Sequence, residues 1–437
     1  MSKTKTLQSV KGMNDILPDE AEKWMVLETL FSALAQDYGY RPIRLPVVEP
    51  TPLFHRAIGE VTDIVEKEMY SFEDSLNGEA LTLRPEGTAG CARAVIQHGL
   101  ASQTAQRLFY IGPMFRHERP QKGRYRQFQQ IGVETFGFSG PDIDVEQILM
   151  SARLWDMLNI GDFLTLRLNS LGQPEERARH RADLIAYLEA HRAKLDEEAL
   201  RRLHSNPLRI LDSKNPDVQA VCADAPKLMD YLEKASLAHF DGVRRLLDAT
   251  GIHYVVDPCL VRGLDYYNLT VFEWVTKKLG AQGTLCAGGR YDGLVAQLGG
   301  KPTPACGWAC GLERILALIA EVSPFDEEMP GPNLYIVHQG EAACDAAFQQ
   351  AEALREVGLS VQLNCGGGSF KAQMKKADAS GAHCAIIIGD DEVRDEVVQL
   401  KFLRDENTPQ QRLPATGLGD LLLDYFFNDT DENEEEF

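Results

Sequence analysis

The 437-residue chain lacks several features that mark specialised classes of protein. It has no run of 18 apolar residues, which argues against a membrane-spanning helix. Its N-terminus has no apolar core of the kind that secretory signal peptides carry, so we expect a cytoplasmic protein without a membrane partner. Its nine cysteines include no Cys-x-x-Cys pair and no zinc-site spacing, which favours reduced thiols in the core.

Basic residues are scarce, with 45 Lys and Arg against 65 Asp and Glu and a net charge of −20. Such a balance argues against indiscriminate nucleic-acid binding, because affinity for phosphate rises with the number of basic contacts. A local basic face still permits an RNA partner, and negative charge elsewhere would penalise wrong docking orientations. No Ser-His-Asp or Cys-His arrangement stands in a recognisable context, so the sequence offers no candidate protein nucleophile.

Residues 107–126 form a basic segment within this acidic chain. They contain five arginines and Lys122 against one acid, Glu118. Because the planar guanidinium group binds phosphate oxygens in a bidentate manner and stays charged, this segment indicates an anionic phosphate ligand. An exposed basic hairpin that contributes only to solubility is the alternative.

The same segment predicts a β-hairpin, with one strand over 108–115 and a second over 127–138. Arg116 on the first strand and Arg124 or Arg126 near the second would then lie at neighbouring positions across the hairpin. The alternative for each single arginine is a surface or structural ion pair, and the grouping of several arginines is what favours a ligand site.

Four further segments combine glycine with arginine or other polar side chains, at 82–90, 262–267, 287–293 and 310–315. The first ends in a predicted helix, and the last leads into an apolar helix. We interpret 287–293, Ala-Gly-Gly-Arg-Tyr-Asp-Gly, as a turn in which three glycines let the backbone approach a ligand closely.

The order and spelling of these segments closely resemble the bacterial histidyl-tRNA synthetases, a family of class II aminoacyl-tRNA synthetases. Residues 262–267 (Arg-Gly-Leu-Asp-Tyr-Tyr) and 287–293 look like the two signatures of the histidine-specific members. Segments similar to the three general class II motifs stand around 46–50, 115–138 and 311–314. The resemblance covers nearly the whole chain.

This resemblance implies an ATP-dependent histidine–tRNA ligase. Such an enzyme activates L-histidine with ATP to histidyl-adenylate, releases pyrophosphate, and transfers the histidyl group to the 3′-terminal adenosine of histidine tRNA. It also implies Mg²⁺ bound with ATP, whose protein ligands the sequence leaves unknown, and a homodimer paired through the first motif. An ordinary edge strand is the alternative there.

Two other functions compete with this interpretation. A catalytically inactive paralogue could act as a regulatory subunit of ATP phosphoribosyltransferase, but such proteins lack the anticodon domain and much of the histidine signature. A general RNA-binding module would bind tRNA without turnover.

Two elements are predicted near the N-terminus. Residues 18–39 predict an amphipathic helix, because Trp24, Leu27, Phe31 and Leu34 recur at three- and four-residue spacing, and residues 44–50 predict a short strand.

The predicted organisation has three parts. A catalytic α+β domain with a mainly antiparallel sheet spans 1–325, with a helical insertion at about 170–250 that the resemblance places near the acceptor arm of tRNA. A linker at 323–332 precedes an anticodon-binding α/β domain at 333–427, in which strands and helices alternate. Residues 428–437, rich in acids, are predicted to be a disordered tail.

The C-terminal part is acidic, with 8 Lys and Arg against 20 Asp and Glu over 333–437. Anticodon recognition would therefore use few basic groups, together with base-edge and stacking contacts. The candidates are Arg355, Lys371, Lys375 and Lys376.

The resemblance also assigns site residues. Arg116 would bind the α-phosphate of ATP and Arg262 would reach it from the opposite side, so these two are the predicted catalytic residues. The predicted ATP-binding residues are Arg116, Glu118, Arg124, Tyr125 and Arg314. The predicted histidine-binding residues are Glu86, Thr88, Gln130, Glu134, Arg262, Tyr266, Tyr267 and Tyr291.

The strand over 127–134 provides the candidate imidazole pocket. Period-two alternation places Gln130, Gly132 and Glu134 on one face, where glycine would leave room and the other two would present polar groups. The resemblance places the histidine ring near Glu134 and Tyr267 and its amino group near Glu86, Thr88 and Gln130. Tyr266 and Tyr291 would be pocket walls, with simple core packing as the alternative.

The loop of the basic hairpin, residues 119–123, is the candidate tRNA contact. Pro120 and Gly123 fix a projecting turn, and Arg119 and Gln121 can bind base edges or phosphates. Histidine tRNA carries an extra guanosine at its 5′ end, and a loop beside the α-phosphate site would lie near that end.

Overall fold

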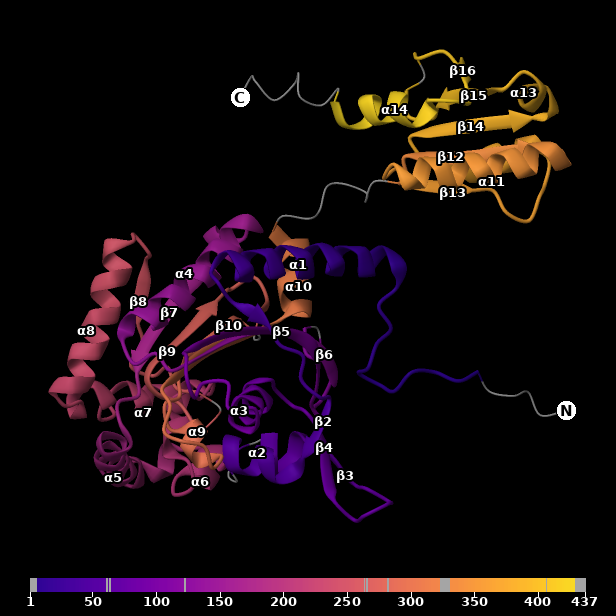
Figure 1. Ribbon diagram of the computed structural model, residues 1–437. Coiled ribbons are helices and arrows are strands. Elements are labelled where there is room, and N and C mark those ends of the chain that lie inside the picture. The colour runs from indigo at the N-terminus through magenta and orange to yellow at the C-terminus, as the bar shows by residue number, and fades with distance from the viewer. Residues whose placement is uncertain are drawn as a thin grey trace, which may run out of the picture. The chain divides into compact units, whose positions relative to one another are not determined.

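An eight-stranded sheet forms the centre of the N-terminal part of the chain in the computed structural model (Figure 1). Its strands lie in the order β1 (Arg41–Pro42), β5 (Gln106–Phe115), β6 (Gln127–Phe136), β11 (Ala305–Gly311), β10 (Thr284–Arg290), β9 (Asn268–Val275), β7 (Thr165–Ser170) and β8 (Tyr254–Val256). The edge pairs β1–β5 and β7–β8 are parallel, and the pairs between them are antiparallel. The predicted, mainly antiparallel sheet is therefore confirmed.

The structure describes residues 6–59, 62, 64–121, 123–262, 264, 266–280, 283–322, 331–405 and 407–428. The chain divides into two units, Met1–Phe325 and Asp326–Phe437, which are treated separately below. Most of the predicted linker and all of the predicted acidic tail except Asn428 lie outside the described residues.

The basic hairpin forms as predicted. Strands β5 and β6 pair without interruption from Gln106↔Phe136 to Phe115↔Gln127, so the second strand ends two residues earlier than expected. The alternation of side chains along β6 sends Ile131 and Val133 to one face of the sheet and Gln130, Gly132 and Glu134 to the other. This division separates an apolar core from the functional face.

Four helices cover the apolar face of the sheet (Figure 1). They are α1 (Pro18–Asp37), α4 (Pro141–Met157), α8 (Lys234–Ala249) and α10 (Leu312–Val322). The periodicity predicted for α1 is confirmed, because Trp24, Leu27, Phe31 and Leu34 are all buried. Phe31 packs edge-to-face against Phe109 and Trp308, with ring centroids 5.7 and 5.9 Å away, and so joins the helix to the sheet.

The opposite face carries α2 (Thr51–Ile58), α3 (Thr88–Gln97) and the short α9 (Leu294–Gln297) (Figure 1). Beside them lies a three-stranded sheet in the order β2 (Val48–Pro50), β4 (Ala80–Leu83), β3 (Tyr70–Glu73). The strand predicted around 44–50 is therefore limited to its last three residues. Helix α3 follows the 82–90 segment as expected.

The interval predicted to be a helical insertion is helical, with α5 (Pro174–Ala190), α6 (Glu197–Arg202), α7 (Pro216–Ala223) and α8. Leu184 and Leu188 of α5 and Val218 of α7 belong to the hydrophobic cluster on the functional side of the sheet. Helix α8 differs, because Phe240 and Val243 belong to the apolar core of the sheet. The last helix is thus part of the central fold, which its charge-rich sequence did not reveal.

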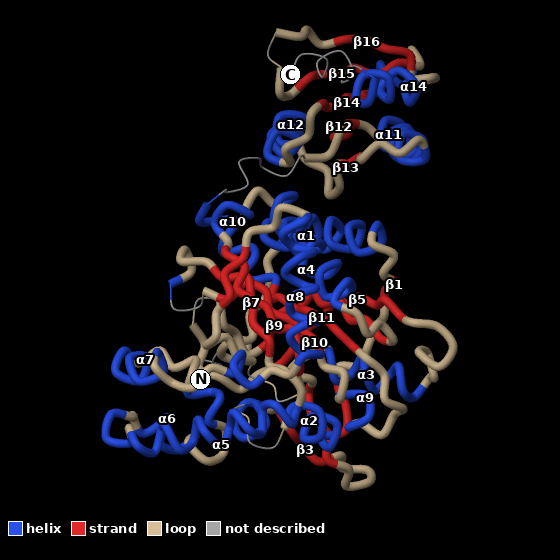
Figure 2. The backbone as a smooth tube through the Cα atoms, turned by 90° about the vertical axis from the view of Figure 1, so that its left-hand side faces the viewer, coloured by secondary structure: helices blue, strands red, loops and turns tan. Residues whose placement is uncertain are grey.

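The C-terminal unit is a five-stranded sheet in the order β13 (Val361–Leu363), β12 (Leu334–Gln339), β14 (Cys384–Gly389), β15 (Val397–Phe402) and β16 (Gln411–Pro414). The first three strands are parallel, as their alternation with helices predicted, whereas β15 and β16 are antiparallel additions that were not predicted. Figure 2 shows α11 (Glu341–Glu356) and α12 (Phe370–Ala379) on opposite sides of this sheet. Helices α13 (Asp390–Arg394) and α14 (Leu418–Leu423) complete the unit.

Within the described ranges, the helices are too short or too polar for any of them to cross a bilayer.

Candidate active site

A cavity opens on the functional face of the large sheet and brings together most of the predicted site residues. Its lining includes Glu86, Thr88, Arg116, Glu118, Arg124, Tyr125, Gln130, Arg262, Tyr266, Tyr267, Glu313 and Arg314. These residues come from the basic hairpin, from the start of α3, from the segment before β9 and from the start of α10. Four separate stretches of sequence therefore meet at one site.

Arg116 lies just beyond the end of β5, and two contacts fix its side chain. Its Nε donates to the carbonyl of Pro85 at 2.9 Å, and its guanidinium carbon lies 5.2 Å from the centroid of the Phe128 ring. Arg126, the other arginine considered for the hairpin, instead donates to the carbonyl oxygens of Glu118 and Lys11. Arg126 thus supports the loop, and Arg124 is the residue that faces the cavity with Arg116.

Arg124 and Arg314 complete a cationic wall. Arg124 forms an ion pair with Glu118, and Arg314 donates to the carbonyl oxygens of Gly123 at 3.1 Å and Thr284 at 2.7 Å. Burial lowers the pKa of Arg314, and the positive charges of Arg124 and Arg116 lower it further. Guanidinium groups that destabilise one another in this way gain most from a multivalent anion such as a polyphosphate.

Arg262 stands on the wall formed by the segment before β9. It pairs with Glu273, and its guanidinium carbon lies 5.5 Å from the centroid of the Tyr267 ring. Its Nε is buried and has no hydrogen-bond partner among the described residues. The ion pair with Glu273 was not predicted, and it gives Arg262 a structural contact in addition to a free donor.

Glu86 and Thr88 stand where α3 begins. The Glu86 carboxylate accepts from the backbone N–H groups of Thr88 at 2.7 Å and Ala89 at 2.9 Å, and so caps the helix. Burial raises the pKa of Glu86, although these hydrogen bonds oppose the effect. Nearby, the Oε1 atom of Gln130 is buried and has no partner within the described part of the chain. A carboxylate and an unpaired carbonyl oxygen together suit a cationic amino group.

Glu134 lies one layer behind the cavity. Only 1% of its surface is exposed, and the hydroxyls of Thr88, at 2.7 Å, Tyr110, at 3.2 Å, and Tyr291 all donate to its carboxyl group. Burial raises the pKa of Glu134 to about 8, against the effect of these hydrogen bonds. The raised pKa favours the neutral acid form of Glu134.

The predicted wall residue Tyr291 shares this second layer. Neither Tyr291 nor Glu134 is among the described residues that line the cavity, and Tyr291 is 1% exposed within the core. Tyr291 therefore packs in the core behind the cavity, which was the alternative interpretation, and its role in binding histidine stays a prediction. Tyr266 and Tyr267 do line the cavity, and the three rings contact one another with centroids 4.6 to 6.1 Å apart.

The role expected for Gly132 is also corrected. A Cβ atom at this position would overlap the ring of Tyr110, so the glycine makes room for a neighbouring tyrosine and not for a ligand. Gly307, on the adjacent strand β11, makes room for Glu134, because a Cβ at position 307 would overlap the Glu134 carboxyl group.

Only the end of the 287–293 segment, at residues 292–293, is a turn. Its first four residues belong to β10, where a Cβ at Gly288 would overlap the backbone of Gly307 and Trp308. At Gly289 it would overlap the carbonyl oxygen of Thr270. Gly288 and Gly289 therefore allow β9, β10 and β11 to pack closely against one another. Their predicted role was to let the backbone approach a ligand.

In the loop at 119–123, Gly123 lines the cavity, whereas Arg119 and Gln121 do not. Arg119 and Gln121 are exposed, and Gln121 and Arg124 exchange backbone hydrogen bonds of 3.0 and 2.9 Å that close the turn. Gly123 has a φ of +72°, which only glycine adopts without strain. Lys122 lies outside the described residues.

Sequence reasoning missed two residues of the site. Tyr110 faces Gly132 across the β5–β6 ladder, and this pairing of a large with an absent side chain was a signal available in the sequence. Glu313 precedes Arg314, and its Oε1 accepts from the Gln129 N–H at 2.8 Å. Burial raises the pKa of Glu313 to about 7, and its Oε2 has no hydrogen-bond partner in the described ranges.

Together, an antiparallel sheet and a cavity walled by arginines from a hairpin and a following helix define a class II aminoacyl-tRNA synthetase. Comparison with known proteins narrows the class. Residues 12–315 match the family described as Histidyl-tRNA synthetase, and residues 333–424 match the Anticodon binding domain. The chain belongs to the histidyl-tRNA synthetase family.

Individual relatives match along the whole chain. It is 65% identical to the histidine–tRNA ligase of Dechloromonas aromatica (strain RCB), over 99% of this chain and 100% of that protein. The histidine–tRNA ligase of Aromatoleum aromaticum is 63% identical over 98% of this chain and 97% of that protein. Among solved structures, apo histidyl-tRNA synthetase from S. aureus is similar with a TM-score of 0.80 and 32% identity, covering 95% of this chain and 100% of that one.

The buried acid gives a pH prediction. Since the pKa of Glu134 is raised above its ordinary value, its contribution to stability is complete below about pH 4.5 and is lost as the pH rises to about 8. Glu134→Gln keeps the shape but cannot ionise. From pH 5 to pH 8.5 we expect the wild-type protein to lose on the order of a few kcal/mol of unfolding free energy relative to this variant. Urea unfolding at both pH values measures the difference, and parallel responses of the two proteins would contradict the assignment.

Proposed function

We infer that this chain is an ATP-dependent histidine–tRNA ligase. It activates histidine with ATP to histidyl-adenylate, releases pyrophosphate and transfers the histidyl group to the 3′-terminal adenosine of histidine tRNA. One observation carries this proposal, beyond the family itself. One cavity combines an arginine wall suited to a polyphosphate with a corner suited to an amino group, where the Glu86 carboxylate lies with the Gln130 Oε1 atom, which has no hydrogen-bond partner among the described residues.

The ATP-binding roles follow from the charges. Arg116 binds the α-phosphate, and Arg262 approaches it from the opposite wall, so the charge that develops there is held from two sides. Arg124 and Glu118 frame the adenosine and outer phosphates with Tyr125. Arg314 binds the γ-phosphate, and the carbonyl groups of Gly123 and Thr284 fix its guanidinium group. The substrate's own carboxylate is the nucleophile, so positioning and charge supply the catalysis.

Histidine fits the remaining corner. Its ammonium group would be received by Glu86 and by the unpaired Oε1 of Gln130, with the Thr88 hydroxyl beside them. Its carboxylate would face the unpaired Nε of Arg262. The ring would then lie against Tyr267 in front of Glu134, whose carboxyl group can donate when protonated and accept when ionised. A ligand without ring nitrogens would leave these groups unpaired, which disfavours its binding strongly.

Mg²⁺ would enter with ATP. The described residues contain no cluster of three or more His, Cys, Asp or Glu side chains that could hold a metal by itself, so the phosphates would supply most of its ligands. Among the acids of the cavity, Glu118 is paired and Glu86 caps a helix, whereas Glu313 has a carboxyl oxygen without a partner in the described ranges. Glu313 is thus the residue best suited to reach the ion. When bound, the ion neutralises phosphate charge.

The proposal includes a homodimer. Helix α1 exposes Met25 (66%) and Val26 (39%), and a surface groove runs beside them between α1, residues 42–47 and β5. A second copy is the proposed occupant, because this is the region that resembles the first class II motif. The mass in solution, measured by light scattering, is expected to be about twice that of the chain, and a monomer at micromolar concentration would contradict it. We propose the cytoplasm as the compartment, since the tRNA and ATP that the reaction uses are consumed there.

The C-terminal unit would bind the anticodon of histidine tRNA. Lys371, Lys375 and Lys376 lie on α12 and are exposed, which suits contacts to phosphates. Arg355 is less suited, because it pairs with Glu352 and donates to the carbonyl of Val361. The alternative, an inactive regulatory subunit of ATP phosphoribosyltransferase, is disfavoured by the presence of this domain and by relatives named as ligases along the whole chain.

Histidine-dependent ATP–pyrophosphate exchange, followed by charging of tRNA, tests the function. Arg262→Ala is expected to reduce exchange by roughly a hundredfold or more, because it removes a donor to the reacting phosphate. The ion pair complicates this variant, since it leaves Glu273 without its partner. We therefore pair Arg262→Ala/Glu273→Gln with Glu273→Gln alone. Exchange near the wild-type rate in the folded double variant would remove Arg262 from the catalytic residues.

The exposed loop gives a separate prediction for the transfer step. Arg119→Ala and Gln121→Ala are expected to leave exchange nearly unchanged, because neither side chain lines the cavity. They should slow transfer to tRNA by an amount worth about 1–3 kcal/mol if a base contact is lost.

The Gln121 effect should also shrink on a transcript that lacks the extra 5′ guanosine. Equal losses on both transcripts would instead indicate a contact to the RNA backbone, and a loss in exchange would mean that the loop shapes the ATP site.

A further inference from the structure

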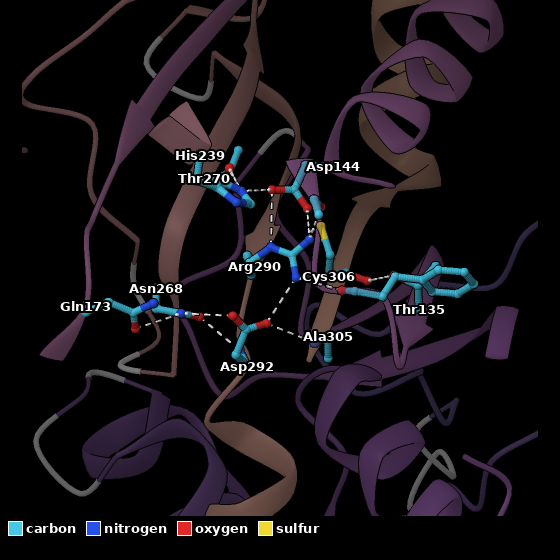
Figure 3. A network of polar contacts seen from close by, with 12 residues as sticks. Thr135, Asp144, Gln173, His239, Asn268, Thr270, Arg290, Asp292, Ala305 and Cys306 are labelled. Carbon is cyan, nitrogen blue, oxygen red and sulfur yellow. Dashed lines mark hydrogen bonds and ion pairs between the residues drawn. The ribbon is translucent and has the colours of Figure 1, made fainter. Parts of the chain in front are cut away.

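A buried ionic cluster lies behind the histidine corner, centred on Arg290 (Figure 3). This side chain is fully buried, and its donors are engaged on all sides. It pairs with Asp144 through Nε and Nη2 and with Asp292 through Nη1 at 3.1 Å. It also donates to the carbonyl oxygens of Phe138 at 2.8 Å and Gly140 at 2.7 Å. Such a buried charge persists only when its hydrogen bonds are complete.

Asp144 on α4 is the second centre of this cluster. It is fully buried and also contacts His239 of α8, whose Nε2 lies 2.8 Å from Asp144 and 3.2 Å from the Thr270 hydroxyl (Figure 3). Burial acts to raise the pKa of Asp144, but the His239 hydrogen bond and the Arg290 charge outweigh it and lower the pKa below the ordinary value. The carboxylate is thus a stable anchor that two helices and the sheet share.

The backbone around this cluster is irregular. Gly289 pairs with Val271, but the next residue, Arg290, pairs with Asn268, so two residues of β9 have no opposite partner. Within this bulge Leu269 has a φ of +48°, which is unusual for a residue with a branched side chain. Bulges near ligand sites re-aim the residues beside them. On its other side, Leu269 accepts from the Leu171 N–H at 2.7 Å and donates to the Gly172 carbonyl at 2.9 Å, and Arg177 donates to the Tyr267 carbonyl oxygen. The interruption therefore concerns only the pairing with β10, which does not by itself set the spacing between the segments of Tyr267 and Tyr291.

Hydrogen bonds of side chains connect β9 to the residues after β10 where the backbone ladder is interrupted. The Asp292 N–H donates to Asn268 Oδ1 at 2.8 Å, and Asn268 Nδ2 donates to Asp292 Oδ2 at 3.2 Å, as Figure 3 shows. Asp292 Oδ1 also receives the N–H of Ala305 at 3.1 Å. Asp292 is therefore held by Arg290 and by β11, and Asn268 is held by Asp292.

Both ends of this chain of bonds adjoin the pocket in the sequence. Asn268 directly follows Tyr267, which lines the cavity, and Asp292 directly follows Tyr291, which donates to Glu134. The Tyr267 and Tyr291 rings lie 6.1 Å apart at 85°. None of Asn268, Arg290 and Asp292 is among the described residues that line the cavity.

We propose that Asn268, Asp292 and Arg290 are positioning residues that set the affinity for histidine without touching it. The Asn268–Asp292 pair joins the segment of Tyr267 to the segment of Tyr291, and Arg290 anchors that pair to the core. The cluster thereby keeps the two tyrosines at the spacing that the imidazole ring requires. This inference rests on the proposed function, since its measure is histidine-dependent exchange.

A swap of the two side chains tests the proposal. Asn268→Asp places a second carboxylate against Asp292, and we expect the KM for histidine to rise about tenfold or more with the KM for ATP within about twofold. Adding Asp292→Asn restores one donor between the pair. We expect the double variant to recover to within about threefold of the wild-type KM for histidine, as coupled neighbours do.

A matched control exists elsewhere in the chain. Asn215 also donates from Nδ2 to a carboxylate, that of Asp196, at 2.8 Å, but neither residue adjoins the cavity. Asn215→Asp creates the same like-charge contact there. It is expected to lower thermal stability with no change in either KM, which separates positioning from a general loss of stability.

Three results would overturn the proposal: an unchanged KM for histidine in folded Asn268→Asp, an equal rise in the KM for ATP, or no recovery in the double variant. If Asn268→Asp does not fold, Asn268→Ala removes both bonds to Asp292, together with the 3.4 Å bond to Gln173, without adding charge, and it is judged by the same two KM values. Absence of histidine-dependent exchange in the wild-type protein would instead refute the proposed function, so the two failures are distinguishable.

Discussion

The burial of one carboxyl group, that of Glu134, constrains the architecture around the site. A carboxyl group removed from water needs donors on every side, and here they come from α3, from β5 and from the residue after β10. Each of these hydrogen bonds fixes the position of the helix or strand segment that carries the donor. The sheet can hold the group only because Gly307 leaves space on the neighbouring strand. The positions of Thr88, Tyr110 and Tyr291 all follow from this requirement.

The cationic wall follows a different principle. Its arginines are held mainly by backbone carbonyl groups, such as those of Pro85, Gly123 and Thr284, and not by acids alone. A carbonyl oxygen orients a guanidinium group without neutralising it. The wall is therefore rigid and still strongly attractive to an anion, which is the preorganised state that stabilises developing charge. Arg262 differs from the others, since it is paired with Glu273 while its Nε has no hydrogen-bond partner among the described residues.

Much of the fold could be predicted from local patterns. The hairpin, the periodicity of α1 and the alternation in the C-terminal unit are properties of neighbouring residues, and the structure confirms them. The four arginines that line the cavity were found through their motifs, as were Glu86 and Glu118, whereas Glu313 was missed. The residues of the second layer, behind the cavity, were harder to predict from the sequence. Tyr291 and Gly132 carry the right residue types, but whether a side chain faces a ligand or another side chain depends on strands distant in the sequence, such as β11 behind Glu134. Helix α8 was misplaced for the same reason, because its partners on the sheet are far away in the chain.

The fit of glycine against large side chains bears on how the specificity of this site could change in evolution. Gly132 and Gly307 each share a fixed space with a neighbour, Tyr110 and Glu134 respectively. A larger residue at either glycine requires a smaller one at its neighbour, so neither step alone gives a packed protein. Recognition of a different amino acid would have to arise through simultaneous paired replacements, a path that accumulating single mutations seldom follow. The close packing thus protects the fidelity of the genetic code, quite apart from any contact with the substrate.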